Sequence, residues 1–194
     1  YNLMKKFKIK SFCKVNLSLE VLKRLRNGYH NIKSLITFCN LYDLITVSKS
    51  KYANDKIIFY GEFSKGINKK LNTITQVLNL LRKNNFLNKQ KFIIKIKKNI
   101  PHGSGLGGGS SNAASLLQFL KNKMYLKISR SQVISIANQI GFDVPIFLEK
   151  KNTFLNGKKN KILRINKKFR LNILIIYPNI ICSTKKIYLK NRKF

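Results

Sequence analysis

Residues 101–114, PHGSGLGGGSSNAA, decide the fold of this chain, with five glycines at positions 103, 105, 107, 108 and 109. The segment before them, 91–97 (KFIIKIK), alternates apolar and charged residues as a half-buried strand does. The segment after them has helical spacing of apolar residues behind three favourable N-cap residues, Ser110, Ser111 and Asn112. The predicted order is strand, glycine-rich loop and helix. Such a loop turns free N–H groups and the positive end of a helix dipole towards a di- or triphosphate.

Other interpretations of the loop fit less well. A flexible linker is not expected to lie so tightly between a patterned strand and a patterned helix. The G-x-x-x-x-G-K-[ST] phosphate loop is excluded because no lysine follows the last glycine. A G-x-G-x-x-G spacing is present, but the first strand and the downstream acidic residue of a dinucleotide-binding unit are missing.

The loop resembles the G-L-G-G-G-S-S-N-A-A motif of the GHMP kinases, which phosphorylate small molecules such as galactose, homoserine and mevalonate. Three further segments are similar to motifs of one family among them, the 4-diphosphocytidyl-2-C-methyl-D-erythritol kinases. Residues 13–19 (CKVNLSL) resemble A-K-[IV]-N-L-x-L, and residues 26–30 (RNGYH) resemble D-G-Y-H. Residues 140–147 (IGFDVPIF) resemble G-[AS]-D-V-P-[FV]-F. The resemblance implies ATP-dependent phosphorylation of the 2-hydroxyl of 4-diphosphocytidyl-2-C-methyl-D-erythritol, with Mg²⁺, in the non-mevalonate route to isoprenoids.

Lys14 and Asp143 match the catalytic pair of that family. Asp143 is one of only six acidic residues in the chain, and a carboxylate there is able to accept the proton of an attacking hydroxyl. A lysine beside it keeps the carboxylate ionised and offsets the charge on the transferred phosphoryl group. Taken without the motifs, Asp143 fits an N-cap equally well, and Lys14 is one lysine among many.

The remaining site residues follow from the resemblance. Asn16, Tyr29 and His30 are expected to bind substrate, the last two at its cytidine end, where an aromatic ring stacks on a base. On composition alone Tyr29 fits a core ring, His30 a surface residue and Asn16 a turn. Ser110 is the one candidate ligand for Mg²⁺, and no other metal ligand is expected. The expected ATP-binding residues are Pro101, Gly103, Ser104, Gly105, Leu106, Gly107, Gly108, Gly109, Ser110, Ser111, Asn72 and Lys98.

The net charge of +34 over 194 residues gives the main competing hypothesis, a basic RNA-binding protein. The lysines are nevertheless spread along the whole sequence, and the favoured residues all have A+T-rich codons. We therefore interpret the charge as a solvated surface that accumulated in an A+T-rich genome, with incidental affinity for an anionic substrate. Functional binding of nucleic acid is not expected on this interpretation.

The element pattern predicts an α+β fold. The resemblance implies the GHMP kinase N-terminal lobe (ribosomal protein S5 domain 2-like) at 4–157 and the start of a second α+β lobe at 158–194. Strands are expected within 5–60, 153–165 and 171–182, and helices at 72–83, 110–122 and 129–140. The last of these helices should begin with a capping box between Ser129 and Gln132.

No apolar run reaches membrane length, and no secretory signal follows Met4. Three scattered cysteines without a C-x-x-C motif favour a reducing compartment and no bound metal, hence a cytoplasmic protein. The lack of a long apolar run argues against a membrane partner, and the resemblance implies a small-molecule partner. The oligomeric state is left open. Residues 156–159 (NGKK) replace the family's G-x-G-E, and the glycine-rich motif of the second lobe is missing. A fragment, or a truncated and inactive kinase remnant, is therefore a further alternative.

Overall fold

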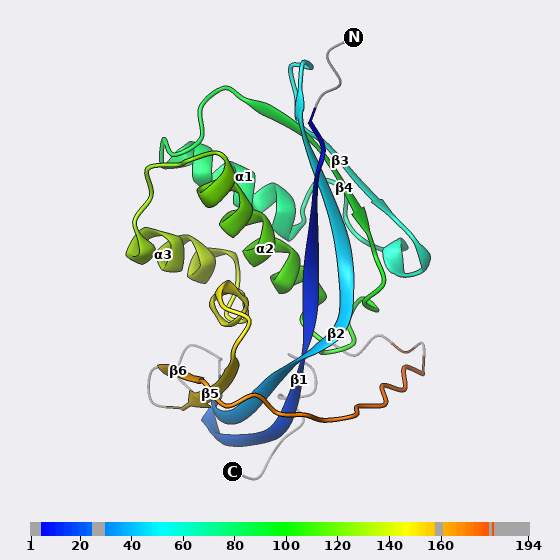
Figure 1. Ribbon diagram of the computed structural model, residues 1–194, viewed down its shortest axis with the longest axis vertical. Helices are drawn as coiled ribbons and strands as arrows, with labels where there is room; N and C mark the ends of the chain where they lie inside the picture. The colour runs from blue at the N-terminus through cyan, green and yellow to red at the C-terminus, as the bar shows by residue number, and fades with distance from the viewer. Residues whose placement is uncertain (1–4, 25–29, 158–160, 179, 181–194) are drawn as a thin grey trace.

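The computed structural model describes residues 5–24, 30–157, 161–178 and 180. Its two longest strands, β1 (Phe7–Arg24) and β2 (His30–Ser50), form an antiparallel ladder along the molecule (Figure 1). Three irregularities interrupt the ladder, the first between Phe12 and Lys14. β-Bulges of this kind re-aim side chains and are common beside active sites.

Two strands pair with β2 along its second edge, and each of them carries one further strand. β4 (Lys91–Lys97) pairs with the end of β2, and β5 (Asn152–Asn156) pairs with its beginning. β3 (Lys56–Tyr60) lies parallel to β4, and β6 (Lys161–Ile165) is antiparallel to β5. The order is β3-β4-β2-β5-β6, with β1 on the free side of β2. The predicted domain boundary at 157/158 falls between β5 and β6, which are neighbours in one sheet. The boundary stays a prediction.

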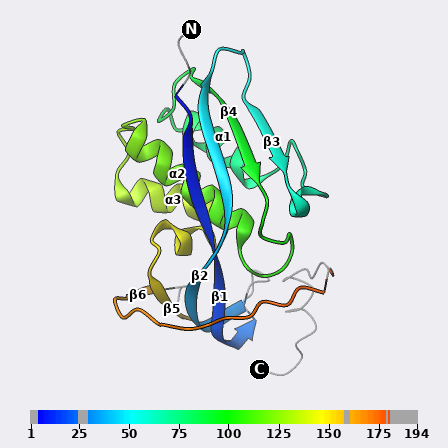
Figure 2. The ribbon, with the colours of Figure 1, turned by 45° about the vertical axis from the view of Figure 1, so that its right-hand side comes forward.

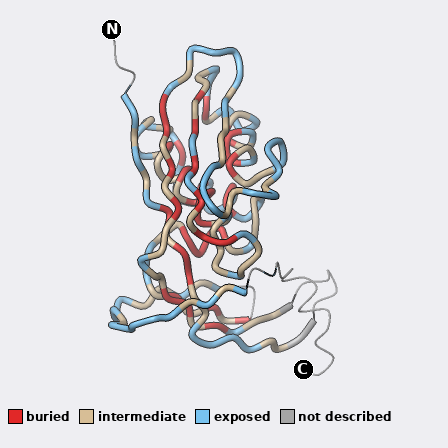
Figure 3. The backbone as a smooth tube through the Cα atoms, turned by 90° about the vertical axis from the view of Figure 1, so that its right-hand side faces the viewer, coloured by how far each residue is buried: buried red, intermediate tan, exposed pale blue. Residues whose placement is uncertain are grey.

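Three helices cover one face of the sheet and leave the other face open (Figures 1 and 2). They are α1 (Thr73–Lys83), α2 (Gly108–Lys123) and α3 (Arg130–Ile140), and two short 3₁₀ helices, η1 (Glu62–Ser64) and η2 (Val144–Leu148), complete the helical elements. The core lies between the layers, where alternate residues of β4 (Phe92, Ile94 and Ile96) meet apolar residues of the helices. Figure 3 shows where the buried and the exposed stretches of the backbone lie. The predicted α+β class is confirmed.

Two of the three α-helices begin where the sequence predicts, and the third does not. Asn72 caps α1, and its Oδ1 accepts a hydrogen bond from the Thr75 N–H at 2.9 Å. The capping box between Ser129 and Gln132 is present at α3. For α2, however, the prediction that Ser110–Asn112 form the N-cap is wrong. The cap is Gly107, whose φ of 72° is readily adopted only by glycine, so the helix begins within the glycine run.

The strand predicted at 171–182 is also wrong where the structure describes it, at 171–178 and 180. These residues form no ladder, and their apolar side chains are exposed, 85% for Leu174 and 81% for Ile176. A strand needs a partner that satisfies its backbone groups, and no described strand forms a ladder with this segment. Residues 181 and 182 lie outside the described range.

Within the described part of the chain, no helix has both the length and the apolar character needed to cross a membrane.

Candidate active site

The loop between β4 and α2 is shaped by its glycines and tied to strand β1. Gly103, Gly105 and Gly107 all have positive φ, between 71° and 77°. The Ser104 hydroxyl donates to the Pro101 carbonyl at 2.8 Å, and the Lys14 N–H donates to the Leu106 carbonyl at 3.1 Å. The second of these bonds fixes the far end of the loop against the strand that carries Lys14.

The first turn of α2 is built for close approach of an anion. The Ser111 N–H donates to the Gly107 carbonyl at 2.8 Å, so the N–H groups of residues 108–110 precede the first intrahelical bond. These donors and the helix dipole favour a phosphate at this end of α2. The turn also contacts α1, where the Thr73 hydroxyl donates to the Gly109 carbonyl at 2.8 Å.

Ser110 and Ser111 are placed differently, although the sequence suggested both for the nucleotide. Ser111 is buried, accepts a hydrogen bond from the Ser11 hydroxyl at 2.7 Å and donates to the Phe12 carbonyl at 2.6 Å. Its hydroxyl therefore joins α2 to β1. Ser110 is only half-buried and remains the candidate for Mg²⁺. The described residues contain no cluster of three histidine, cysteine or acidic residues suited to a metal.

Lys14 and Asp143 are brought together from distant parts of the chain. Lys14 lies on β1 just after a ladder irregularity, and Asp143 is the N-cap of η2, without a side-chain capping bond. The Lys14 Nζ is 3.9 Å from the Asp143 Oδ2. Lys14 is 8% exposed, whereas the Asp143 side chain is 44% exposed. A buried ammonium thus sits behind a carboxylate that faces solvent.

Asn16 holds the Lys14 ammonium in this position. Lys14 Nζ donates to the Asn16 Oδ1 at 2.5 Å, and the Asn16 Nδ2 donates to the Ser34 hydroxyl at 2.6 Å. Ser34 in turn donates to the Ser18 carbonyl at 2.6 Å. Burial lowers the pKa of Lys14 from its ordinary value, and the charge of Asp143 partly opposes that effect.

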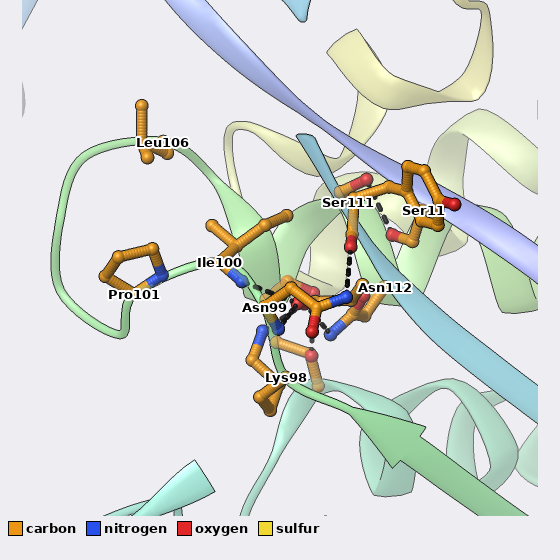
Figure 4. A network of polar contacts seen from close by, with 12 residues as sticks. Ser11, Lys98, Asn99, Ile100, Pro101, Leu106, Ser111 and Asn112 are labelled. Carbon is orange, nitrogen blue, oxygen red and sulfur yellow. Dashed lines mark hydrogen bonds and ion pairs between the residues drawn. The ribbon is translucent and has the colours of Figure 1, made fainter. Parts of the chain in front are cut away.

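Asp43 is the residue of the site that sequence reasoning missed. It is fully buried on β2 and forms an ion pair with Lys98. Its Oδ1 accepts the N–H groups of Asn99 and Ile100 at 2.8 and 2.9 Å, and its Oδ2 accepts the Asn112 Nδ2 at 3.0 Å. Figure 4 shows these contacts between the root of the loop and the first turns of α2. The only signal in the sequence was a carboxylate in an apolar run of a chain with six acidic residues.

Two predicted ATP residues have their polar groups occupied by the protein. The Lys98 ammonium is buried against Asp43, and burial lowers the pKa of Lys98 while Asp43 opposes this. Asn72 caps α1 with its Oδ1, and its Nδ2 donates to the carbonyls of Asn68 and Lys69, each at 3.1 Å. Contact of Lys98 or Asn72 with ATP stays a prediction.

The predicted cytidine-binding residues are the least described. Tyr29 lies outside the described residues. His30 begins β2 and pairs with Arg24, and its side chain is not among the described ones. Beside the loop, a pocket is lined by Val15, Ser104 and Leu106 together with residues 173–177. The Tyr177 hydroxyl donates to the His102 carbonyl there, at 3.4 Å.

The chain is similar to known proteins along almost its whole length. Residues 72–151, which contain the loop and Asp143, match the GHMP kinases N terminal domain. A 4-diphosphocytidyl-2-C-methyl-D-erythritol kinase from Pelagibacter ubique (strain HTCC1062) is 43% identical over 191 residues, covering 98% of this chain and 67% of that protein. This chain belongs to the 4-diphosphocytidyl-2-C-methyl-D-erythritol kinase family.

Two further members of this family show how much of it the chain represents. The kinase of the same name from Caldicellulosiruptor bescii is 34% identical over 93% of this chain and 62% of that protein. A crystal structure of a 4-(cytidine 5'-diphospho)-2C-methyl-D-erythritol kinase matches with a TM-score of 0.67 and 26% identity, over 82% of this chain and 55% of that one. The chain therefore spans between 55% and 67% of the length of these three family members.

Proposed function

We propose that this chain provides the nucleotide-binding loop and the catalytic pair of an ATP-dependent kinase for the 2-hydroxyl of 4-diphosphocytidyl-2-C-methyl-D-erythritol, in the non-mevalonate route to isoprenoids. The observation that carries the proposal is the junction of the glycine loop with the Lys14–Asp143 pair. The Lys14 backbone is bonded to Leu106 of the loop, and its ammonium is 3.9 Å from Asp143. A phosphate at the start of α2 would thus lie near a cation and a general base.

The reaction needs little beyond positioning and charge neutralisation. The Asp143 carboxylate accepts the proton of the 2-hydroxyl, and that oxygen forms a bond to the γ-phosphorus of ATP. The bond between the γ-phosphorus and its bridging oxygen breaks, and ADP leaves with the electron pair. Lys14 neutralises charge on the transferred group, and the N–H groups of 108–110 hold the phosphates.

The site offers Mg²⁺ one candidate protein ligand. The half-buried Ser110 hydroxyl in the first turn of α2 would be its protein ligand, with the phosphates supplying most of the remaining oxygens. Mg²⁺ held there would withdraw negative charge from the phosphates. Asn16, Tyr29 and His30 are proposed to bind the substrate, the aromatic pair at its cytosine ring.

Cytoplasmic residence belongs to the same proposal. It is supported by Cys13 and Cys39, which are both free thiols, as expected in a reducing compartment.

The test is release of ADP by the purified chain with ATP, Mg²⁺ and 4-diphosphocytidyl-2-C-methyl-D-erythritol. We expect Asp143→Asn to lower kcat by about 10²–10⁴-fold and to leave nucleotide binding nearly unchanged. Glu62→Gln is the matched control, because it removes the same charge from exposed η1. Release that does not depend on the substrate, or an Asp143→Asn variant as active as the control, contradicts the proposal.

A further inference from the structure

The open face of the sheet carries an ordered set of lysines. Side chains of a strand alternate between faces, and in β4 the residues at 92, 94 and 96 enter the core. The intervening positions of β4 therefore point away from the helices, as do alternate residues of β1 and β3. We call this surface the basic sheet face and define it by its six lysines, Lys8, Lys10, Lys56, Lys91, Lys95 and Lys97.

Strand register arranges these lysines in rows across the sheet. One row joins Lys10, Leu44, Lys97 and Tyr60 on four neighbouring strands. The next joins Lys8, Thr46, Lys95 and Ile58. Figures 2 and 3 show the strands that bear these rows, with no helix packed over them.

No acidic residue stands in either of these two rows. The exposed Glu20 of β1 lies farther along the β1–β2 ladder, where its register partner is Lys33. Among the described residues, none of the six lysines forms an ion pair. Four of the six carboxylates of the chain pair with other cations: Asp43 with Lys98, Asp55 with Arg82, Asp143 with Lys14 and Glu149 with Arg130. The face is therefore an uncompensated cationic surface.

Aromatic rings accompany the lysines at the β1–β2 end of the face. The rings of Phe12 and Tyr42 meet edge to face with centroids 5.4 Å apart. Lys150 Nζ lies 3.2 Å from the Phe12 centroid, and Lys10 Nζ lies 4.8 Å from the Tyr42 centroid. Burial lowers the pKa of Lys150, and the nearby charge of Lys10 lowers it further. Two ammonium groups are held close together here, an arrangement that an anion between them would relieve.

Contrary to the expectation drawn from the sequence, where the lysines are scattered, we propose that the basic sheet face binds single-stranded RNA. A cationic surface that tracks the phosphates, with aromatic rings on which bases stack, is the common design of sheets that bind single strands. A membrane fits less well, because the apolar outward residues Leu44, Ile58 and Ile93 are half-buried between lysines instead of protruding. The proposal does not depend on the kinase activity, since none of these lysines belongs to the candidate active site.

Binding of a fluorescent oligouridine of about 15 nucleotides, followed by anisotropy over a range of salt, tests the proposal. The triple variant Lys10→Gln, Lys95→Gln and Lys97→Gln should lose at least about tenfold in affinity. The slope of log affinity against log salt should fall by about 2, because each phosphate contact on a single strand contributes about 0.7.

The matched control removes the same charge from the helical side, with Lys121→Gln, Lys123→Gln and Lys127→Gln. We expect it to change affinity by less than about twofold. Likewise, Tyr60→Leu should weaken binding by about fivefold or more, whereas Tyr125→Leu, which alters an exposed tyrosine after α2, should not.

Equal losses in the two triple variants would show that net charge alone attracts RNA, and would overturn the proposal. So would tighter binding to vesicles containing phosphatidylserine than to the oligouridine, because the face would then be a membrane surface. The variant with Lys10→Gln, Lys95→Gln and Lys97→Gln should release ADP at an unchanged rate, which would show that RNA binding and kinase activity use different residues.

Discussion

Lys14 is a cation held in a place that disfavours charge. Its ammonium is buried, and among the residues that the structure describes Asn16 and the more distant Asp143 compensate it. A lysine whose pKa is lowered by folding binds fewer protons in the folded state than in the unfolded one. Its burial therefore costs stability at neutral pH, and the cost disappears as the pH rises from the lowered pKa towards 10.5. Such a cost is typical of functional residues.

Deprotonation of Lys14 should affect activity in the opposite direction: it removes a cost in stability, but it also removes a cation that the reaction needs. Because the Lys14 pKa is lowered, we expect kcat to decline on the alkaline side at a pH below 10.5, as the ammonium loses its proton. In Lys14→Arg the remaining activity should persist to higher pH, since the guanidinium stays protonated. A pH profile of ADP release checks this, and superimposable alkaline limbs for the two proteins would refute the role of Lys14.

Asp43 offers a second test at the scale of single residues. Asp43→Leu leaves the Lys98 ammonium buried without a partner and removes the acceptor of the Asn99 and Ile100 N–H groups. We expect the free energy of unfolding to fall by about 3–5 kcal/mol, measured by urea denaturation. Adding Lys98→Met should restore part of the loss. A loss no larger than that of Glu62→Gln, about 0.5 kcal/mol or less, would disprove the anchoring role.

At the scale of elements, the glycine loop and α2 form one unit with β1. The loop is bonded to β1 through Leu106 and Lys14, and α2 is bonded to it through Ser111. The loop is also limited by η2, because a Cβ at Gly107 would lie 2.5 Å from the Phe147 Cζ. Phosphate binding and the placement of Asp143 at the start of η2 are therefore expected to be coupled.

Two glycine substitutions separate backbone strain from this contact. Gly105 and Gly107 have φ of 77° and 72°, so alanine at either costs about 1–2 kcal/mol. Only Gly107→Ala also collides with Phe147, since nothing lies within 4 Å of a Cβ at position 105. We expect Gly107→Ala to be the less stable variant in urea and to raise KM for ATP more. Equal effects would show that the Phe147 contact is unimportant.

At the scale of the whole molecule, 40 basic residues face six acidic ones. Self-repulsion of this size destabilises the compact state, and salt relieves it. We expect Tm to rise between ionic strengths of about 0.01 and 0.1 M, over which the Debye length falls from about 30 to 10 Å. The triple lysine variant of the sheet face should show a smaller rise. A Tm that is independent of salt would contradict this account.

The sequence alone determined the local order of this protein. Strand, glycine loop and helix follow from hydrophobic period and from glycine, and the capping box of α3 follows from two residues three positions apart. These features depend on neighbours along the chain, so pattern and propensity suffice to predict them. Motifs extended this to family membership and to Lys14 and Asp143 as candidates.

Only the tertiary structure decided what lies beside what. It placed the Lys14 ammonium against Asn16 and Asp143, enclosed Asp43 among four donors, and showed that 171–178 has no partner strand among the described residues. It also collected lysines that are scattered in sequence onto one sheet face. Strand register and helix packing set these distances, and both depend on contacts between residues far apart in the chain, which hydrophobic period does not encode.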